Sequence, residues 1–360
     1  MRPGPTTDQM ADPMWVGARV AVMRGRTVLA TGVRIWDAVL EGTASRTVPE
    51  QLTFKVNNNW LPTYPQAPFN NFGQRVNPTQ VLGLPGGVTR MDLGWYQIDA
   101  WEEQDDGSVE VTALNLLKRP DESDLTWPTS PPAGATLRSE FQRMAGDGLP
   151  VILDPGVVDR PVPRTTQYGT SRTDNIRDLA AAYSVEYGVK SDGYLHVWMP
   201  RTGRDPVAHY TGRDLGKPGR RAGRLLAAPR VSQDRRPNQW TVVGTQNAGG
   251  REQRWSATVR TTTQPFEPDA YGVVTDRREM NIATSQQQVT LAAQTYQRHA
   301  MMTVETRSVE IAPDPRLELG DVISVTTRSG ETIVGRVAAY SLPLTDHTAS
   351  MRVDLEVLQW

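Results

Sequence analysis

Alternating strand patterns separated by turn signals occupy both ends of this 360-residue chain and constrain its fold more than any other feature. In residues 109–114, apolar side chains alternate with polar ones, which is the period of a strand with one solvated face. Near the C-terminus, residues 322–327, 332–340 and 351–358 follow one another as three strands with turn residues between them. Both ends therefore predict antiparallel β-structure.

The first predicted region, 15–118, follows a polar N-terminal arm, 1–14, and is interrupted by a long segment at 57–93. This segment is rich in Asn, Pro and Gly, and a loop of such length in a compact domain is usually functional or ordered by a partner. Its four candidate interface residues are aromatic: Trp60, Tyr64, Phe69 and Phe72. We expect them to contact a partner, because aromatic side chains are poorly tolerated in water, and the alternative is a disordered excursion.

The middle region, 119–225, changes character after a Pro-rich bridge at 127–132. Ser171 begins a helix, and apolar residues at i, i+3, i+4 and i+7 from Ile176 form one stripe along it. A hairpin at 185–199 follows the helix. This region predicts a small α/β module.

The last region, 226–360, returns to β-structure but carries an inserted helical segment at 265–304, in which Ser285 and Gln288 form a capping pair. The predicted fold is mainly β with an α+β module: two small antiparallel β-barrels flank the small α/β domain. No residue-level repeat supports the duplication. We favour barrels because closure removes exposed strand edges.

Composition narrows the possible chemistry. The chain has no cysteine, so disulfides, thiolate-zinc sites and cysteine nucleophiles are excluded, and its net charge of −1 gives no long-range attraction to nucleic acid or anionic lipid. No stretch approaches the roughly 20 apolar residues of a membrane span, and no secretion signal is recognised. The four histidines are not paired at metal-ligand spacing, and acidic residues at turns, such as Asp314 and Asp321, are expected to be solvated. We predict no catalytic, metal or cofactor site.

One basic cluster stands out in this neutral chain, and its residues lie near the boundary at 225. It comprises Arg220, Arg221, Arg224, Arg235 and Arg236. Such a run can contact phosphate, but it lacks the aromatic platforms that bind single strands, so we favour a solvated linker.

Three short motifs in this order resemble a known family. Residues 313–323, with the Gly320-Asp321 step into a strand, resemble the start of the last barrel of phage tail hub proteins. Residues 70–76 followed by 94–99 are similar to the first barrel of actinobacterial siphophage minor tail proteins, and 174–193 resembles the module between the barrels. This family in turn resembles the central baseplate hub of contractile-tailed phages.

The resemblance implies a structural virion protein at the tail tip, assembled in the host cytoplasm. It implies a homotrimer whose two barrels per chain form a pseudo-sixfold ring, which adapts the sixfold tail tube to a threefold tip. The implied partners are the distal tail protein ring, the tape-measure protein, downstream tip or fibre proteins, and DNA in transit. We expect 57–93 and 265–304 to make contacts with the tube-side ring and the next subunit, and any spike or lysin activity to belong to another chain.

Two alternatives come from other classes of protein. One is a tail-tip enzyme that degrades cell wall, which would need a cleft with a perturbed acid or histidine pair. The other is a glycan-binding adhesin, in which Trp60 and Trp127 would stack on sugars, although both are better explained as loop anchors.

Overall fold

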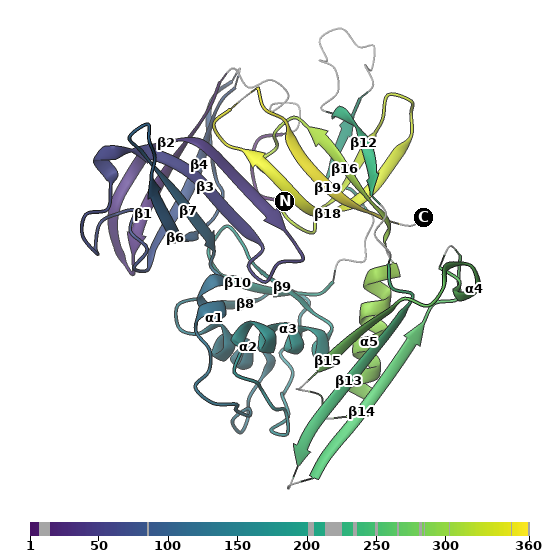
Figure 1. Cartoon of the computed structure of the whole chain (residues 1–360). Coiled ribbons are helices and arrows are strands. Elements are labelled where there is room, and N and C mark those ends of the chain that lie inside the picture. The colour runs from purple at the N-terminus through teal and green to yellow at the C-terminus, as the bar shows by residue number, and fades with distance from the viewer. Residues whose placement is uncertain are drawn as a thin grey trace.

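The computed structural model describes residues 1–6, 15–84, 86–200, 205–212, 225–232, 236–248, 251–264, 266–280, 283, 285–301, 303–346 and 348–358. Strand makes up 46% and helix 16%, so the predicted mainly β class is confirmed. In Figure 1 the two β regions lie side by side, and the smaller α/β parts lie together beneath them. Among the described residues, no helix has the length and apolarity that a bilayer crossing requires.

Six antiparallel strands of the first β region pair in a cycle, in the order β1, β2, β3, β7, β6, β4 and back to β1. They are β1 (Trp15–Arg24), β2 (Thr27–Thr43), β3 (Glu50–Asn57), β4 (Gln74–Leu84), β6 (Tyr96–Glu103) and β7 (Ser108–Asn115). A seventh strand, β5 (Gly87–Asp92), pairs with β4. Tight turns at 25–26 and 104–107 join β1 to β2 and β6 to β7 as antiparallel hairpins.

The segment 57–93 is not one long loop, because it contains β4 and β5. Its irregular part is 58–73, which starts with the short 3-10 helix η2 (Asn58–Trp60). The sequence pattern hid β4, since Pro78 lies within it and proline disfavours a strand interior. In the structure Pro78 stands in register with Val20 of β1.

Six strands of the C-terminal half pair in the order β12, β16, β19, β18, β17, β11. They are β11 (Ala208–Thr211), β12 (Leu225–Ser232), β16 (Thr303–Ile311), β17 (Val322–Thr326), β18 (Thr332–Pro343) and β19 (Met351–Leu358). The last three match the strands predicted from the alternating pattern.

The two β regions are joined into one 13-stranded sheet. The far end of β2 pairs with β18, from Thr43 opposite Ala339 to Val39 opposite Pro343. Apolar side chains from both regions also form one buried cluster, which includes Leu40 and Leu342. The strand pairing therefore does not show two separate closed barrels. β2 is 17 residues long, so one part of it belongs to the first ring of strands and its far end pairs with the second β region.

The middle module contains the helix that begins at Ser171 and the hairpin at 185–199, both as predicted. Its elements are α1 (Lys118–Glu122), α2 (Leu137–Ala145), β8 (Val151–Leu153), α3 (Arg172–Tyr183), β9 (Glu186–Val189) and β10 (Leu195–Trp198). The side chains of Thr136 and Ser171 accept hydrogen bonds from the first-turn amides of α2 and α3, so both helices begin at capped residues. The strands form a small sheet in the order β8, β10, β9.

A second small sheet interrupts the C-terminal strands between β12 and β16. It consists of β13 (Gln239–Ala248), β14 (Arg251–Arg260) and β15 (Thr275–Met280), with α4 (Pro268–Tyr271) and α5 (Gln286–Met301). The predicted insert at 265–304 covers α4, β15 and α5. Gly244 of β13 allows the segment before α5 to approach, because a Cβ there would lie 2.5 Å from Cβ of Ala283. This sheet shares its buried cluster with the middle module, so the chain has two main cores.

Candidate functional site

The loop at 58–73 is anchored by two of the four predicted aromatic residues. Phe69 is fully buried, and Trp60 packs half-buried against the same core. The Phe69 ring meets Phe54 at 6.0 Å and Trp60 at 5.7 Å between centroids, both edge-on. Edge-to-face packing is the favoured geometry for aromatic pairs, so these residues hold the loop on its own domain.

Polar contacts fix the rest of the loop. The side-chain amide of Gln74 is buried and donates to the carbonyls of Pro65 and Ala67, each at 2.9 Å. Asn70 donates through Nδ2 to the Tyr64 carbonyl at 3.0 Å. The loop therefore has a defined conformation without any partner.

The other two aromatic residues face solvent on this fixed loop. Tyr64 is 55% exposed and Phe72 is 57% exposed. Aromatic side chains are enriched at protein interfaces, and a pre-formed loop loses little conformational entropy on binding. Tyr64 and Phe72, which we call the aromatic loop surface, are thus the exposed half of the predicted interface set, whereas Trp60 and Phe69 are structural anchors.

The predicted basic linker falls mostly outside the described residues, where Arg220, Arg221, Arg224 and Arg235 lie. Arg236 is described. Its backbone amide donates to the Tyr271 hydroxyl at 2.7 Å, and its Nη2 donates to Thr306 Oγ1 at 3.1 Å. Arg236 therefore connects the inserted sheet to β16.

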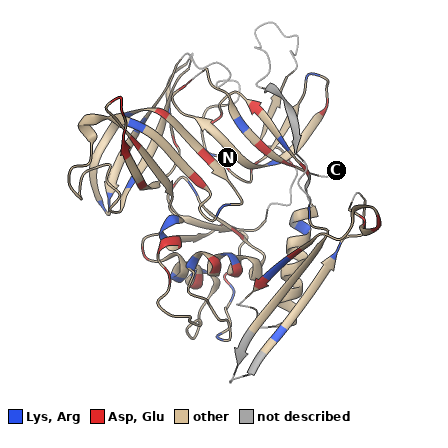
Figure 2. Ribbon diagram, viewed as in Figure 1, with Lys and Arg blue, Asp and Glu red and all other residues tan. Residues whose placement is uncertain are grey.

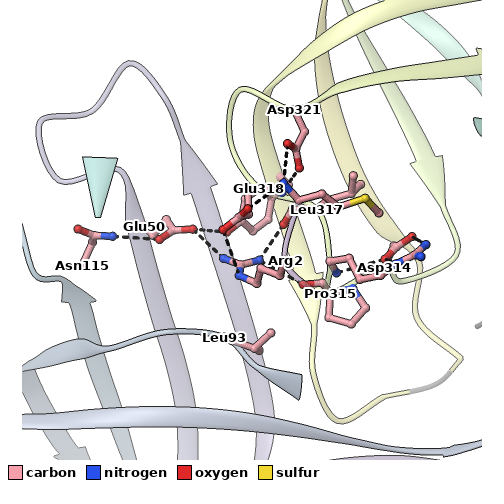
Figure 3. Close-up of polar contacts among 12 residues, drawn as sticks. Arg2, Glu50, Leu93, Asn115, Asp314, Pro315, Leu317, Glu318 and Asp321 are labelled. Carbon is pink, nitrogen blue, oxygen red and sulfur yellow. Dashed lines mark hydrogen bonds and ion pairs between the residues drawn. The ribbon is translucent and has the colours of Figure 1, made fainter. Parts of the chain in front are cut away.

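The most polar part of the interior lies where the two β regions meet, and Figure 3 shows it around Arg2. Only 5% of Arg2 is exposed. Its Nη1 donates to the carbonyls of Leu317 and Pro315, at 2.7 and 3.2 Å, and its Nη2 lies 3.3 Å from Oε1 of Glu50. Glu318 approaches Nε at 3.8 Å. One cation thus contacts both β regions.

Glu50, the first residue of β3, is the common acceptor of this group. Its carboxylate accepts hydrogen bonds from Tyr340 at 2.5 Å, Asn115 at 3.0 Å and Tyr96 at 3.5 Å, besides the ion pair with Arg2. Burial, followed by the nearby charge of Glu50, raises the pKa of both tyrosines well above the usual value. Burial alone would lower the pKa of Arg2, but the surrounding acidic groups outweigh it and raise that pKa. The group therefore keeps Arg2 charged and the tyrosines neutral at physiological pH.

A second buried ion pair corrects an expectation. Asp314 and Asp321 are 0% and 1% exposed, not solvated turn residues. Asp314 accepts hydrogen bonds from Nη2 of Arg316 at 2.7 Å and from the Tyr210 hydroxyl at 2.8 Å. The local sequence does not reveal this burial, because the partner Tyr210 lies on β11, 104 residues earlier in the chain. We call this pair and the Arg2–Glu50 group the seam cluster.

His196 is held between two carboxylates in the middle module. Its Nδ1 lies 2.6 Å from Asp154 Oδ1 and its Nε2 lies 2.8 Å from Asp192 Oδ2. Lys190 also pairs with Asp154 at 2.5 Å. Burial opposes ionisation of Asp154, but the hydrogen bonds from Lys190 and His196 prevail and lower its pKa. Both ring nitrogens are occupied, so this histidine fastens the β9–β10 turn.

Within the part of the chain that the structure describes, no group of three or more His, Cys, Asp or Glu side chains could hold a metal ion. Trp127, proposed above as a sugar platform or loop anchor, is 76% exposed and Trp60 is half-buried.

No protein-family model matches the sequence, and no curated protein matches it either. Solved structures of phage tail proteins share its fold. The tail protein from Neisseria meningitidis MC58 is 12% identical with a TM-score of 0.58, over 94% of this chain and 96% of that chain. The 43 kDa tail protein of prophage MuSo2 from Shewanella oneidensis is 12% identical with a TM-score of 0.56, over 93% and 97%.

A third structure, prophage tail protein gp18 from Listeria monocytogenes EGD-e, is 10% identical with a TM-score of 0.51, over 94% of each chain. The likeness covers both β regions, the module and the insert together. The chain therefore has the fold of phage tail proteins, as the order of its sequence motifs predicted.

Proposed function

We propose that this chain is a structural subunit of a phage tail tip, a hub that assembles as a ring and does not act as an enzyme. The observation that carries the proposal is the likeness to phage tail proteins over more than nine-tenths of the chain, at TM-scores of 0.51 to 0.58. The resemblance of the sequence motifs to siphophage minor tail proteins extends it to the tip of an actinobacterial phage.

The hub role follows from two β units in one chain. Three copies of such a chain present six similar β units around an axis, which would match a sixfold tail tube to a threefold tip. The two units are the ring of β1, β2, β3, β4, β6 and β7 and the open row of C-terminal strands, which the β2–β18 pairing joins in one sheet. Their fixed orientation rests on the β2–β18 pairing and the seam cluster.

The implied partners are the distal tail protein ring on the tube side and tip or fibre proteins on the other. The tape-measure protein and then DNA would pass through the lumen of the ring. A channel that passes a polyanion works best without strong attraction. Positive and negative side chains are interspersed along both β regions (Figure 2), and the net charge is −1.

The test is the mass of the purified chain in solution and its image by electron microscopy. We expect light scattering to give three times the chain mass and class averages to show a ring with a central channel. A chain that stays a monomer at high concentration, and does not join a purified tail tube, would contradict the hub role.

The aromatic loop surface provides a second test. Deletion of 57–93 would remove β4 from between β1 and β6, so it cannot separate folding from assembly. Replacement of Tyr64 and Phe72 by Ser changes only exposed side chains. We expect the double variant to fold normally but to join tails poorly, and normal incorporation would refute the assignment of this surface.

The rival functions have direct assays. A zymogram on host cell walls that shows clearing by this chain would contradict a purely structural role. Binding of the isolated chain to host glycans, lost on replacement of Trp127 by Ala, would favour the adhesin.

A further inference from the structure

A groove on the outside of the first β region carries two unpaired arginines. It has a volume of about 300 Å³ and lies across β1, β2 and β4. Its polar and aromatic lining residues are Trp15, Arg19, Arg34, Trp36 and Thr345. This groove is separate from the aromatic loop surface and from the seam cluster.

The two arginines stand directly opposite each other. Arg19 of β1 is the register partner of Arg34 of β2, and both are exposed. Like charges at directly opposed positions destabilise an antiparallel pair, because their Cβ atoms lie only about 5 Å apart. Among the described residues neither arginine has an ion pair or a side-chain hydrogen bond. The nearest acidic residue on β2, Asp37, pairs with Lys55 at 3.4 Å.

The surroundings of the arginine pair are apolar. Trp15 lies flat over Gly83, since a Cβ there would come within 2.2 Å of the indole Nε1. Gly17 of β1 and its register partner Val81 of β4 also line the groove. Gly17 adds no side chain to it, and Val81 is buried. Two guanidinium forks beside tryptophan rings suit a carboxylate that carries an apolar neighbour, because the forks make charge-assisted hydrogen bonds to the carboxylate and the rings offer a surface for the apolar group.

We propose that this groove binds an acidic peptide segment of a neighbouring tail protein, with one carboxylate held between Arg19 and Arg34. Charge complementarity favours an acidic occupant, because a carboxylate between Arg19 and Arg34 would relieve the repulsion between their two positive charges. The volume accommodates two or three side chains, which is the size of a short loop and not of a folded domain. The inference deepens the proposed function, since it assigns a chemistry to one contact of the assembly.

The test uses the full chain in solution and three probes. They are a capped Gly-Glu-Phe-Glu-Gly peptide, the same peptide with Gln in place of Glu, and sodium glucuronate, with binding measured by calorimetry. We expect the acidic peptide to bind with a Kd on the order of 0.1–1 mM and the Gln peptide to bind at least tenfold more weakly. Equal binding of the two peptides would overturn the proposal. Glucuronate bound as tightly as the acidic peptide would assign the groove to an anionic glycan and equally overturn it.

Variants separate binding from stability. Arg34→Gln should weaken acidic-peptide binding at least tenfold, whereas Arg26→Gln, an exposed arginine in the turn of the same hairpin, should not change it. Arg34→Glu should abolish binding and yet raise the melting temperature, by about one degree, because it replaces a repulsive pair with an ion pair. Unchanged binding in Arg34→Gln, or a lower melting temperature in Arg34→Glu, contradicts the proposal.

Peptide binding does not require ring formation, so its outcome is independent of the oligomeric state. Light scattering on the same samples records whether trimers form. Trimers that do not bind the acidic peptide would refute the groove assignment but not the hub role. A monomer that binds the peptide would count against the hub role but support the groove assignment.

Discussion

Replacement of Glu50 by Ala should destabilise the joined β sheet more than any substitution of an exposed acidic residue. Glu50 is 9% exposed and is contacted by Arg2, Asn115, Tyr96 and Tyr340, which come from four separate segments of the chain. The substitution removes the negative charge and the acceptor together. The cation of Arg2 and the hydroxyl of Tyr340 then stay buried without this partner.

The magnitude follows from the contacts. Breaking a buried ion pair by removal of one member costs about 3–5 kcal/mol, because it leaves an uncompensated charge. Arg2 keeps its hydrogen bonds to the carbonyls of Leu317 and Pro315, which places the loss at the lower end. We expect about 3 kcal/mol for Glu50→Ala, and about 2 kcal/mol for Glu50→Gln, which retains one acceptor oxygen.

Urea unfolding measures this loss. A slope of about 1–3 kcal/mol per molar urea converts 3 kcal/mol into a midpoint shift of roughly 1–3 M in the transition of the joined sheet. Glu41→Gln is the matched control, since Glu41 lies exposed on β2 close to the same seam. A Glu50→Ala midpoint within error of the Glu41→Gln midpoint would refute the view that this carboxylate ties the two β regions together.

Four further substitutions test other parts of the molecule. Phe69→Ala should cost about 3–5 kcal/mol in urea unfolding because it empties a buried site, whereas Phe72→Ala should stay within about 0.5 kcal/mol. Gly42→Ala should cost about 1–3 kcal/mol of stability, because the new Cβ would lie 2.6 Å from the Tyr340 ring across the β2–β18 pairing. An unchanged stability would show that the two strands can move apart there without loss of stability. Burial raises the pKa of Asp178 to about 6, so its ionisation should remove about 2 kcal/mol of stability as pH rises from 4 to 7, and Asp178→Asn should abolish that part of the pH dependence.

The sequence predicted elements whose own residues carry the signal. The three C-terminal strands, the capped helices of the module and the β6–β7 hairpin all have strong local periodicity or turn residues. β4 was missed because Pro78 and Gly83 break its pattern, and because its partner β1 lies far away along the chain. The pairing of β2 with β18 could not be foreseen, since nothing local distinguishes the part of β2 that continues past the first ring of strands.

The candidate surfaces also depend on features that the local sequence does not carry. Aromatic residues in a loop are equally consistent with an anchor and with a contact, and only burial separates Phe69 from Phe72. Arg19 and Arg34 are 15 positions apart in the sequence, and their opposition depends on the register shifts within the β1–β2 hairpin. Arg2 lies in an arm that looked merely polar, and its role depends on Glu50 and Leu317 from both β regions.

The distribution of cores determines which parts of this chain can move as units. Both β regions share one buried cluster and one sheet, and their seam is closed by a buried cation, so a change in their relative angle would expose charge as well as apolar surface. The middle module and the inserted sheet share the other cluster. Rearrangement at lower cost is therefore expected between the joined β sheet and the module with its insert, because each has its own buried cluster. In the hub proposed above, the joined β sheets would form the rigid part, and movement would be confined to the middle module and the inserted sheet.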